Sequence, residues 1–134
     1  RLGDLICASA AGTDSAAIGK LNDGLTLPSV ADWKLLYSAV NVAENAGISM
    51  SVGPVFTSDL FYGPDPELFS KLTRHGILGV EMEIAGLYTI SQAEGVQALA
   101  LVTVSDDIIR QEIMSSADRE STFDEMIQVA LGIV

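Results

Sequence analysis

The sequence predicts an α/β fold in which helices on both faces cover a mostly parallel or mixed sheet, giving three layers. Two observations carry this prediction. Short apolar runs typical of strands alternate with segments of helical periodicity, and those segments are long enough to connect parallel strands. The chain has 134 residues, which is enough for one compact core but not comfortably for two. We therefore expect a single domain over residues 1–134.

The first half of the chain is predicted to contain two strands and one helix. Small and polar residues follow the first apolar run and predict a loop. Ser29 is the expected N-cap of the helix, and Gly47 is expected to end it. Gly53–Pro54 predicts a kink or bulge in the second strand. These elements are expected at residues 2–8 (strand), 9–22 (loop), about 31–46 (helix) and 48–56 (strand).

The second half of the chain is predicted to alternate helices with strands. Pro66 and Glu67 favour a helix start, and Gly76 and Gly95 are expected to end helices. The run over 97–104 is almost continuously apolar, which is typical of a parallel strand buried on both faces. These elements are expected at residues 66–73 (helix), 77–83 (strand), 84–94 (helix), 97–104 (strand) and about 116–133 (helix).

Composition argues against several classes of function. The chain has 18 acidic and 7 basic residues, and its net charge of -11 disfavours non-specific binding to nucleic acid or to anionic lipid. Its apolar runs are too short for a membrane span, and no signal-peptide pattern opens it. Cys7 is the single cysteine, so an internal disulfide is excluded and a reducing, cytoplasmic compartment is expected. The chain starts at Arg1 and enters a predicted strand directly, so we expect it to be a portion of a larger protein.

Polar or aromatic side chains gather at the ends of three predicted strands. They are Phe61–Tyr62, Glu81–Met82–Glu83 and Ser105–Asp106. If the strands are parallel, their carboxyl ends share one rim of the sheet, which is where active sites of this architecture lie. The sequence therefore predicts a site that combines these three segments.

The chemistry of these groups leaves alternatives open. Asp106 can serve as a general acid with Arg119 as its partner, or it can cap a turn. Glu81 and Glu83 can accept hydrogen bonds from sugar hydroxyls, ligate a metal or face solvent. A metal site is the weaker idea, because the only histidine, His75, lies before a turn and no cluster of His or Cys accompanies the acids.

Four stretches carry a family resemblance: Ser58–Tyr62, Gly76–Glu83, Thr103–Asp106 and Ala117–Phe123. Together they resemble purine nucleoside phosphorylases of the bacterial, high-molecular-mass (DeoD-type) family. The Val-Glu-Met-Glu motif is shared more widely, but its combination with the Phe-Tyr pair and the spaced arginine is specific. The resemblance runs over nearly the whole chain with little or no gap.

The resemblance implies a nucleoside phosphorylase-like fold and a reversible reaction in purine salvage. Purine ribo- or deoxyribonucleosides would be split by phosphate into free base and pentose 1-phosphate, with phosphate as co-substrate and no cofactor. Asp106 would protonate the purine at N7 as the glycosidic bond breaks, and Arg119 would favour that transfer. Ser105 would help to position the base, and Phe61 would pack against it.

The resemblance also assigns the sugar-binding residues. Glu83 would accept hydrogen bonds from the ribose hydroxyls, Glu81 would contribute more loosely, and Val80 and Met82 would line the pocket. The family assembles as a homo-oligomer, a dimer-based hexamer in which a neighbouring subunit lends a histidine and an arginine to each site. Its phosphate-binding glycine-rich turn and arginines belong to an amino-terminal half outside these 134 residues. The chain is therefore expected to be the carboxyl-terminal portion of a larger phosphorylase domain.

Two other functions stay open from sequence. One is a nucleoside hydrolase of the same superfamily, which would use water in place of phosphate. The other is a non-catalytic remnant that binds a nucleoside without a phosphate site. Arg119 and the Phe61–Tyr62 pair favour the phosphorylase.

Overall fold

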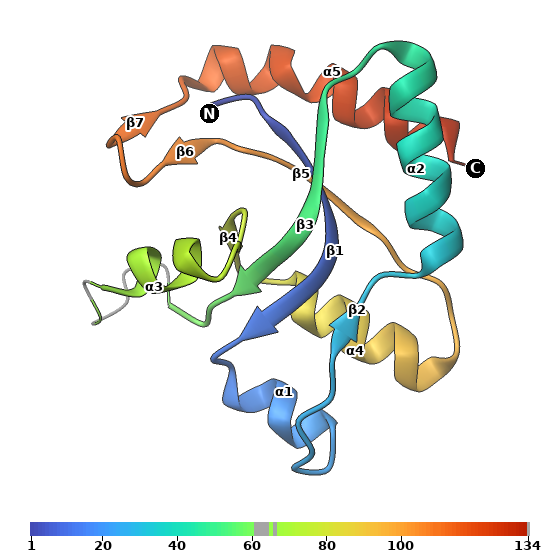
Figure 1. Cartoon of the computed structure of the whole chain (residues 1–134), viewed down its shortest axis with the longest axis vertical. Coiled ribbons are helices and arrows are strands. Elements are labelled where there is room, and N and C mark those ends of the chain that lie inside the picture. The colour runs from blue at the N-terminus through green and yellow to red at the C-terminus, as the bar shows by residue number, and fades with distance from the viewer. Residues whose placement is uncertain (61–64, 66, 134) are drawn as a thin grey trace.

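The computed structural model describes residues 1–60, 65 and 67–133, with only the backbone of residues 116–122. A sheet runs through the centre of the molecule, with β1 and β3 side by side (Figure 1). The main strands are β1 (Leu5–Thr13), β3 (Met50–Thr57) and β5 (Ala100–Thr103), with two-residue strands β2 (Ser29–Val30), β4 (Val80–Glu81), β6 (Asp106–Asp107) and β7 (Glu112–Ile113). The helices are α1 (Ala16–Leu21), α2 (Trp33–Ala46), α3 (Leu68–Arg74), α4 (Ile84–Glu94) and α5 (Ser116–Gly132).

Side chains that alternate along β1 build a core on each face of the sheet. Leu5 and Cys7 pack with α2 and α5, while Ile6 and Ala8 pack with α4. Because successive residues of a strand point to opposite faces, this alternation creates the two helical layers. Helices α2 and α5 therefore lie on one face and α4 on the other, which confirms the predicted α/β class with its three layers (Figure 1).

The sheet is mixed around β1. Strand β1 is parallel to β3 over the length of both, and β4 is parallel to β3. Strands β2 and β5 pair antiparallel with the other edge of β1, at Ala10–Ala11 and at Leu5–Ala8 respectively. The prediction of a parallel strand within 97–104 is therefore wrong. The chain leaves α4 beside β2, where the Asp32 amide donates to the Ala98 carbonyl at 2.9 Å, so β5 runs back along β1.

The segment 9–22 is not the loop that its composition predicts. Strand β1 continues to Thr13, and α1 follows, with the Ser15 hydroxyl accepting from the Ala17 amide at 3.3 Å. Pairing of Ala10–Thr13 with β3 outweighs the low strand propensity of alanine and glycine there. The predicted irregularity at Gly53–Pro54 is present as a register shift, but the extra residue, Ser9, lies in β1.

Helix ends follow local rules more closely. Helices α2 and α4 end at Gly47 and Gly95 in the left-handed conformation, with φ of 67° and 66°. The predicted cap Ser29 is wrong, because Ser29 is buried in β2 and bonds the Thr89 hydroxyl at 3.0 Å. Asp32 caps α2 instead, accepting from two backbone amides at 2.9 and 3.0 Å.

A buried tyrosine ties α4 to the sheet. Tyr88 has no exposed surface, and its hydroxyl donates to the Ala8 carbonyl at 2.5 Å and accepts from the Ala100 amide at 3.0 Å. Ala8 and Ala100 are register partners, so the hydroxyl lies between the two strands at the end of their ladder.

Burial raises the pKa of the Cys7 thiol to about 11. None of the helices in the described part of the chain is long and apolar enough to cross a bilayer.

Candidate functional site

A hollow of about 460 Å³ opens beside β4 and the segment that follows β5. Ile6 and Val55 belong to its lining and also to the core layer on the α4 side of the sheet. One wall is the segment 77–81, another is the segment 102–109, and α3 contributes Phe69, Leu72 and Thr73. Segments far apart in the sequence thus meet around one cavity of a size suited to a small-molecule ligand.

Four of the predicted site residues line this hollow: Val80, Glu81, Ser105 and Asp106. Met82 and Glu83 are exposed in the turn between β4 and α4 and are not part of the lining. Phe61 lies outside the described residues. Arg119 lies in the described backbone of α5, but its side chain does not belong to the described part.

The sequence predicts that a common rim of strand ends brings the site segments together, and the hollow does not form in that way. Glu81 pairs with Thr57, which pairs on its other side with Thr13, so Glu81 lies level with the carboxyl end of β1, one strand away from it. Strand β5 is antiparallel, and its last residue, Thr103, pairs with Leu5 at the amino end of β1. The strand ends therefore do not share one rim. The two segments meet instead around a cavity on one face of the sheet.

Ser105 and Asp106 form a hydroxyl–carboxyl pair at this cavity. The Ser105 hydroxyl lies 2.6 Å from Oδ2 of Asp106, and both residues are half-buried. Asp106 is held in β6, which pairs with β7, and the Met114 amide donates to the Ser105 carbonyl at 2.9 Å. This backbone support gives the carboxyl a defined place in the wall of the hollow.

Glu81 occupies a structural position at the start of α4. Its Oε2 accepts from the backbone amides of Glu83 and Ile84 at 2.7 and 2.6 Å. Its other oxygen accepts a short hydrogen bond from the Thr57 hydroxyl, which in turn accepts from the Ala85 amide at 2.8 Å. Sequence reasoning missed Thr57, because the strand pairing that brings it to Glu81 leaves no local signal.

Asp14 is a second residue that the sequence did not single out. It follows β1 and accepts from the Ser58 hydroxyl at 3.2 Å and from the Asp59 amide at 3.3 Å. It therefore joins the loop after β1 to the loop after β3. The positions 58 and 59 belong to a recognised motif, but their partner 44 residues earlier could not be inferred from that motif.

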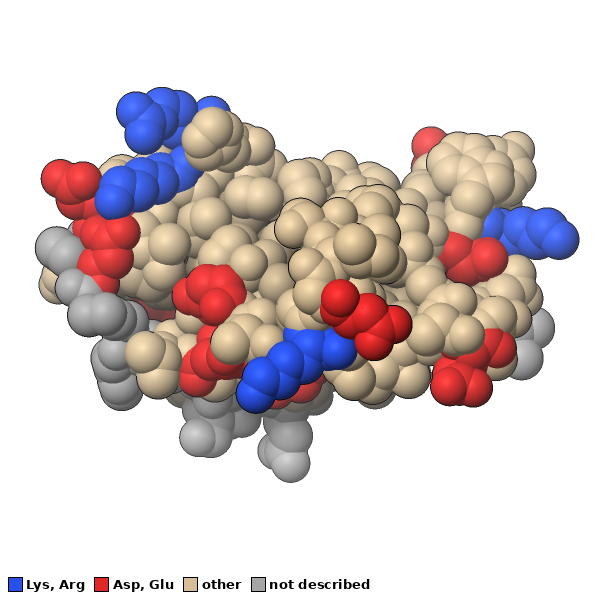
Figure 2. Space-filling model, turned by 90° about the horizontal axis from the view of Figure 1, so that it is seen from below, with Lys and Arg blue, Asp and Glu red and all other residues tan. Residues whose placement is uncertain are grey.

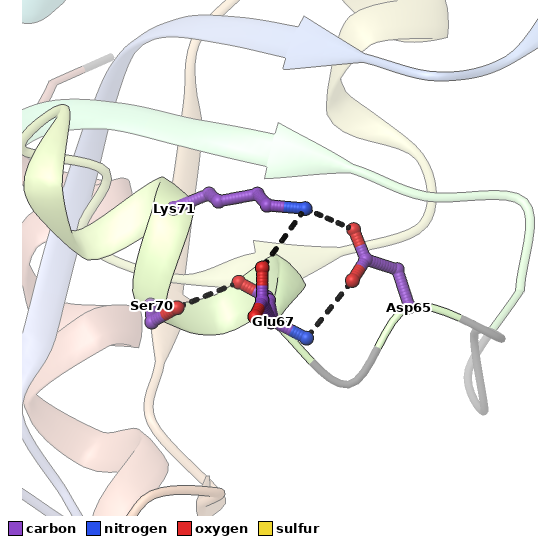
Figure 3. Close-up of polar contacts among 4 residues, drawn as sticks. All are labelled: Asp65, Glu67, Ser70 and Lys71. Atoms are coloured by element: carbon purple, nitrogen blue, oxygen red, sulfur yellow. Dashed lines mark hydrogen bonds and ion pairs between the residues drawn. The ribbon is translucent and has the colours of Figure 1, made fainter.

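Lys71 of α3, the helix that contributes one wall of the hollow, is engaged by two acids. In α3, Lys71 lies 2.8 Å from Asp65 and 3.6 Å from Glu67 (Figure 3). The Asp65 side chain also accepts from the Glu67 amide at 2.9 Å. The hydrogen bond to Lys71 lowers the pKa of Asp65, and the same bond raises the pKa of Lys71. This exposed cluster orders the start of α3.

On one face of the molecule, charged side chains are dispersed rather than clustered. Figure 2 shows acidic and basic side chains interspersed over a largely uncharged face. Of the described residues that line the hollow, only Arg1 is basic. Among the described residues, no group of three or more His, Cys, Asp or Glu side chains lies together in a way that could hold a metal. The described lining of the hollow therefore offers carboxylates, hydroxyls and apolar walls.

Comparison with known proteins gives a consistent result. The model of the family described as "Phosphorylase superfamily" matches residues 1–134. The chain is 44% identical over 131 residues to purine nucleoside phosphorylase DeoD-type 2 of Vibrio cholerae, covering 98% of the chain and 56% of that protein. It is 45% identical over 130 residues to purine nucleoside phosphorylase DeoD-type of Myxococcus xanthus, covering 97% and 54%. The chain thus spans about half the length of these curated relatives.

Proposed function

The chain belongs to the phosphorylase superfamily and, within it, to the DeoD-type purine nucleoside phosphorylase family, and from that premise we propose that it takes part in purine nucleoside phosphorolysis. The reaction converts a purine ribo- or deoxyribonucleoside and phosphate into free base and pentose 1-phosphate. One observation supports this proposal above the others. The Val80–Glu81 and Ser105–Asp106 segments, both within motifs of the resemblance, line one hollow of about 460 Å³.

Asp106 is the proposed proton donor. As the bond between the sugar and the base breaks, the base gains negative charge, and protonation at N7 turns it into a neutral leaving group. A phosphate oxygen then bonds to the anomeric carbon. The Ser105 hydroxyl at 2.6 Å orients the Asp106 carboxyl for this transfer. Arg119 is proposed to stabilise the carboxylate that remains.

Glu83 is the proposed acceptor for the ribose hydroxyls. Its side chain is exposed, and within the described part of the chain its carboxylate has no hydrogen-bond or ion-pair partner. Val80 of β4 and Met82 of the turn are proposed to supply apolar surface, and Phe61 is proposed to pack against the base. A carboxyl rather than an amide at position 106 suits both 6-amino and 6-oxo purines.

The phosphate requirement separates this proposal from a second candidate, a nucleoside hydrolase. That candidate is favoured by the single basic residue, Arg1, among the described residues of the hollow. In the phosphorylase reading, phosphate is bound by groups outside this hollow, including residues from a neighbouring copy in a homo-oligomer.

The experiment is to incubate the protein with adenosine or inosine, with and without phosphate, and to identify the sugar product. Pentose 1-phosphate that forms only with phosphate supports the proposal. Free pentose formed at an undiminished rate without phosphate would show a hydrolase instead. Nucleoside binding without turnover would show the non-catalytic alternative for this 134-residue chain.

A further inference from the structure

The two carboxylates of the turn after β4 have opposite surroundings. Glu81 is half-buried, and both of its oxygens accept hydrogen bonds, from two backbone amides at 2.7 and 2.6 Å and from the Thr57 hydroxyl. Glu83 is exposed, and within the described residues its carboxylate has no recorded partner. The two acids are only two positions apart in the sequence. Their environments differ because backbone amides hold the Glu81 carboxylate and do not hold the Glu83 carboxylate.

Thr57 completes the arrangement around Glu81. Its side chain is buried, with the residue 3% exposed, and its hydroxyl accepts from the Ala85 amide at 2.8 Å while donating to Glu81. The first amides of a helix have no partner within the helix and must find one elsewhere. Glu81 and Thr57 together satisfy the amides of Glu83, Ile84 and Ala85, and the negative charge of Glu81 lies at the positive end of the helix.

Glu83 occupies the N-cap position of α4 but makes no capping hydrogen bond with its side chain. A residue at that position usually provides the cap itself. Here the cap comes from the residue two positions earlier and from the neighbouring strand. The N-cap carboxylate therefore remains available for another partner.

We infer that Glu81 and Thr57 are positioning residues whose displaced cap keeps the Glu83 carboxylate available for the sugar hydroxyls of a nucleoside. Glu81 is then no substrate ligand, although it lines the hollow. This inference rests on the proposed function for the identity of the ligand, while the cap itself stands on the hydrogen bonds of the turn.

A consequence is that breaking the cap weakens nucleoside binding without removing any group that touches the nucleoside. When the amides of Ile84 and Ala85 lose their partners, Glu83 is the nearest carboxylate that can take the capping role. The sugar then loses a charged acceptor. A hydrogen bond to a charged group corresponds to a change of roughly 10- to 100-fold in affinity.

The experiment is a double-mutant cycle with Thr57→Val, Glu81→Ala and both together, with Thr57→Ser as the matched control that keeps the hydroxyl. One readout is amide hydrogen exchange at Ile84 and Ala85, measured without ligand. The other is the KM for the nucleoside and, separately, kcat. We expect each single variant to speed exchange and to raise the KM by about 10-fold or more, with the double variant little worse than either. Thr57→Ser is expected to match the wild type.

The result that overturns the inference is a raised KM in Glu81→Ala beside an unchanged KM and slow exchange in Thr57→Val, which would make Glu81 a direct ligand. Rapid exchange of both amides in the wild type would also overturn it. If Glu81→Ala does not fold, the comparison of Thr57→Val with Thr57→Ser decides the question. If the wild type turns over no nucleoside, the proposed function fails, and amide exchange alone still tests the cap.

Discussion

Replacing Tyr88 by phenylalanine tests how α4 is held on the sheet. The substitution removes only the hydroxyl, which bridges the Ala8 carbonyl at 2.5 Å and the Ala100 amide at 3.0 Å inside the core. The ring itself stays, and with it the packing against Ile84 and the rest of the core layer on that face. Any loss of stability can therefore be assigned to the two hydrogen bonds.

The size of the stability loss depends on whether the Ala8 carbonyl and the Ala100 amide find new hydrogen-bond partners. If the Ala8 carbonyl and the Ala100 amide both stay unpaired, the free energy of unfolding falls by about 2–6 kcal/mol, since each buried unpaired group costs about 1–3 kcal/mol. If the two register partners close up and bond directly, the loss is about 1 kcal/mol. For a chain of 134 residues, the larger loss lowers Tm by roughly 7–21 °C.

Alkaline pH gives an independent measure of the same hydroxyl. Burial raises the pKa of Tyr88 to about 12, above its ordinary value of roughly 10. Between these values the unfolded chain releases the proton and the folded chain keeps it, so stability is present below about pH 10 and is lost as the pH rises towards 12. The loss over this interval amounts to about 3 kcal/mol.

The assay is urea unfolding followed by circular dichroism at several pH values from neutral to alkaline. The matched control is Tyr37→Phe, the same chemical change on a ring that is 56% exposed and stacks on Trp33. We expect Tyr88→Phe to be destabilised at neutral pH and to lose less stability than the wild type above about pH 10. Equal stability of Tyr88→Phe, Tyr37→Phe and wild type, or an equal alkaline loss in all three, would refute the reasoning.

Three further predictions concern the site and the packing. Asp106→Asn is expected to reduce kcat/KM by roughly 10²- to 10⁴-fold for adenosine and by less for inosine, and equal losses on the two substrates would contradict the proton-donor role. The Cys7 thiol, buried and with a pKa of about 11, is expected to react with a disulfide reagent at neutral pH only after denaturation; rapid reaction of the folded protein would contradict this. Gly132→Ala would place a Cβ 2.7 Å from the stiff Val42 side chain and is expected to cost about 1–3 kcal/mol, whereas Gly19→Ala, with nothing within 4 Å, is expected to stabilise α1 by about 0.5–1 kcal/mol. Thermal unfolding of the two glycine variants checks the pair, and an equal Tm would count against the packing argument.

Local rules were sufficient where a structural feature depends on neighbours in the sequence. The bounds of α4 match the prediction of 84–94, because Gly95 adopts the left-handed conformation that ends a helix. Gly47 ends α2 for the same reason. The family resemblance is likewise carried by short motifs, and the match of the superfamily over the whole chain agrees with it.

The same local rules gave wrong predictions where the structure depends on pairing between strands that are distant in the sequence. Composition predicts a loop over 9–22, but the second half of β1 is stabilised by β3, which lies some 40 residues later along the chain. The direction of β5 follows from the place where the chain emerges from α4, beside β2. The apolar run over 97–104 carries no information about that direction. Because β5 is antiparallel to β1, its carboxyl end does not lie on the same rim of the sheet as the carboxyl ends of β3 and β4, so the expected common rim is absent.

By itself the sequence predicted the α/β class, the glycines that end α2 and α4, and the three carboxylates proposed for the site, Glu81, Glu83 and Asp106. Only the tertiary structure decided which hydrogen-bond partners each glutamate has. Glu81 is held by Thr57, 24 residues away, and by the first amides of α4, whereas Glu83 is exposed with no recorded partner among the described residues. The physical reason is that hydrogen-bond partners are assigned by strand register and helix placement, and neither can be read from a motif of five residues.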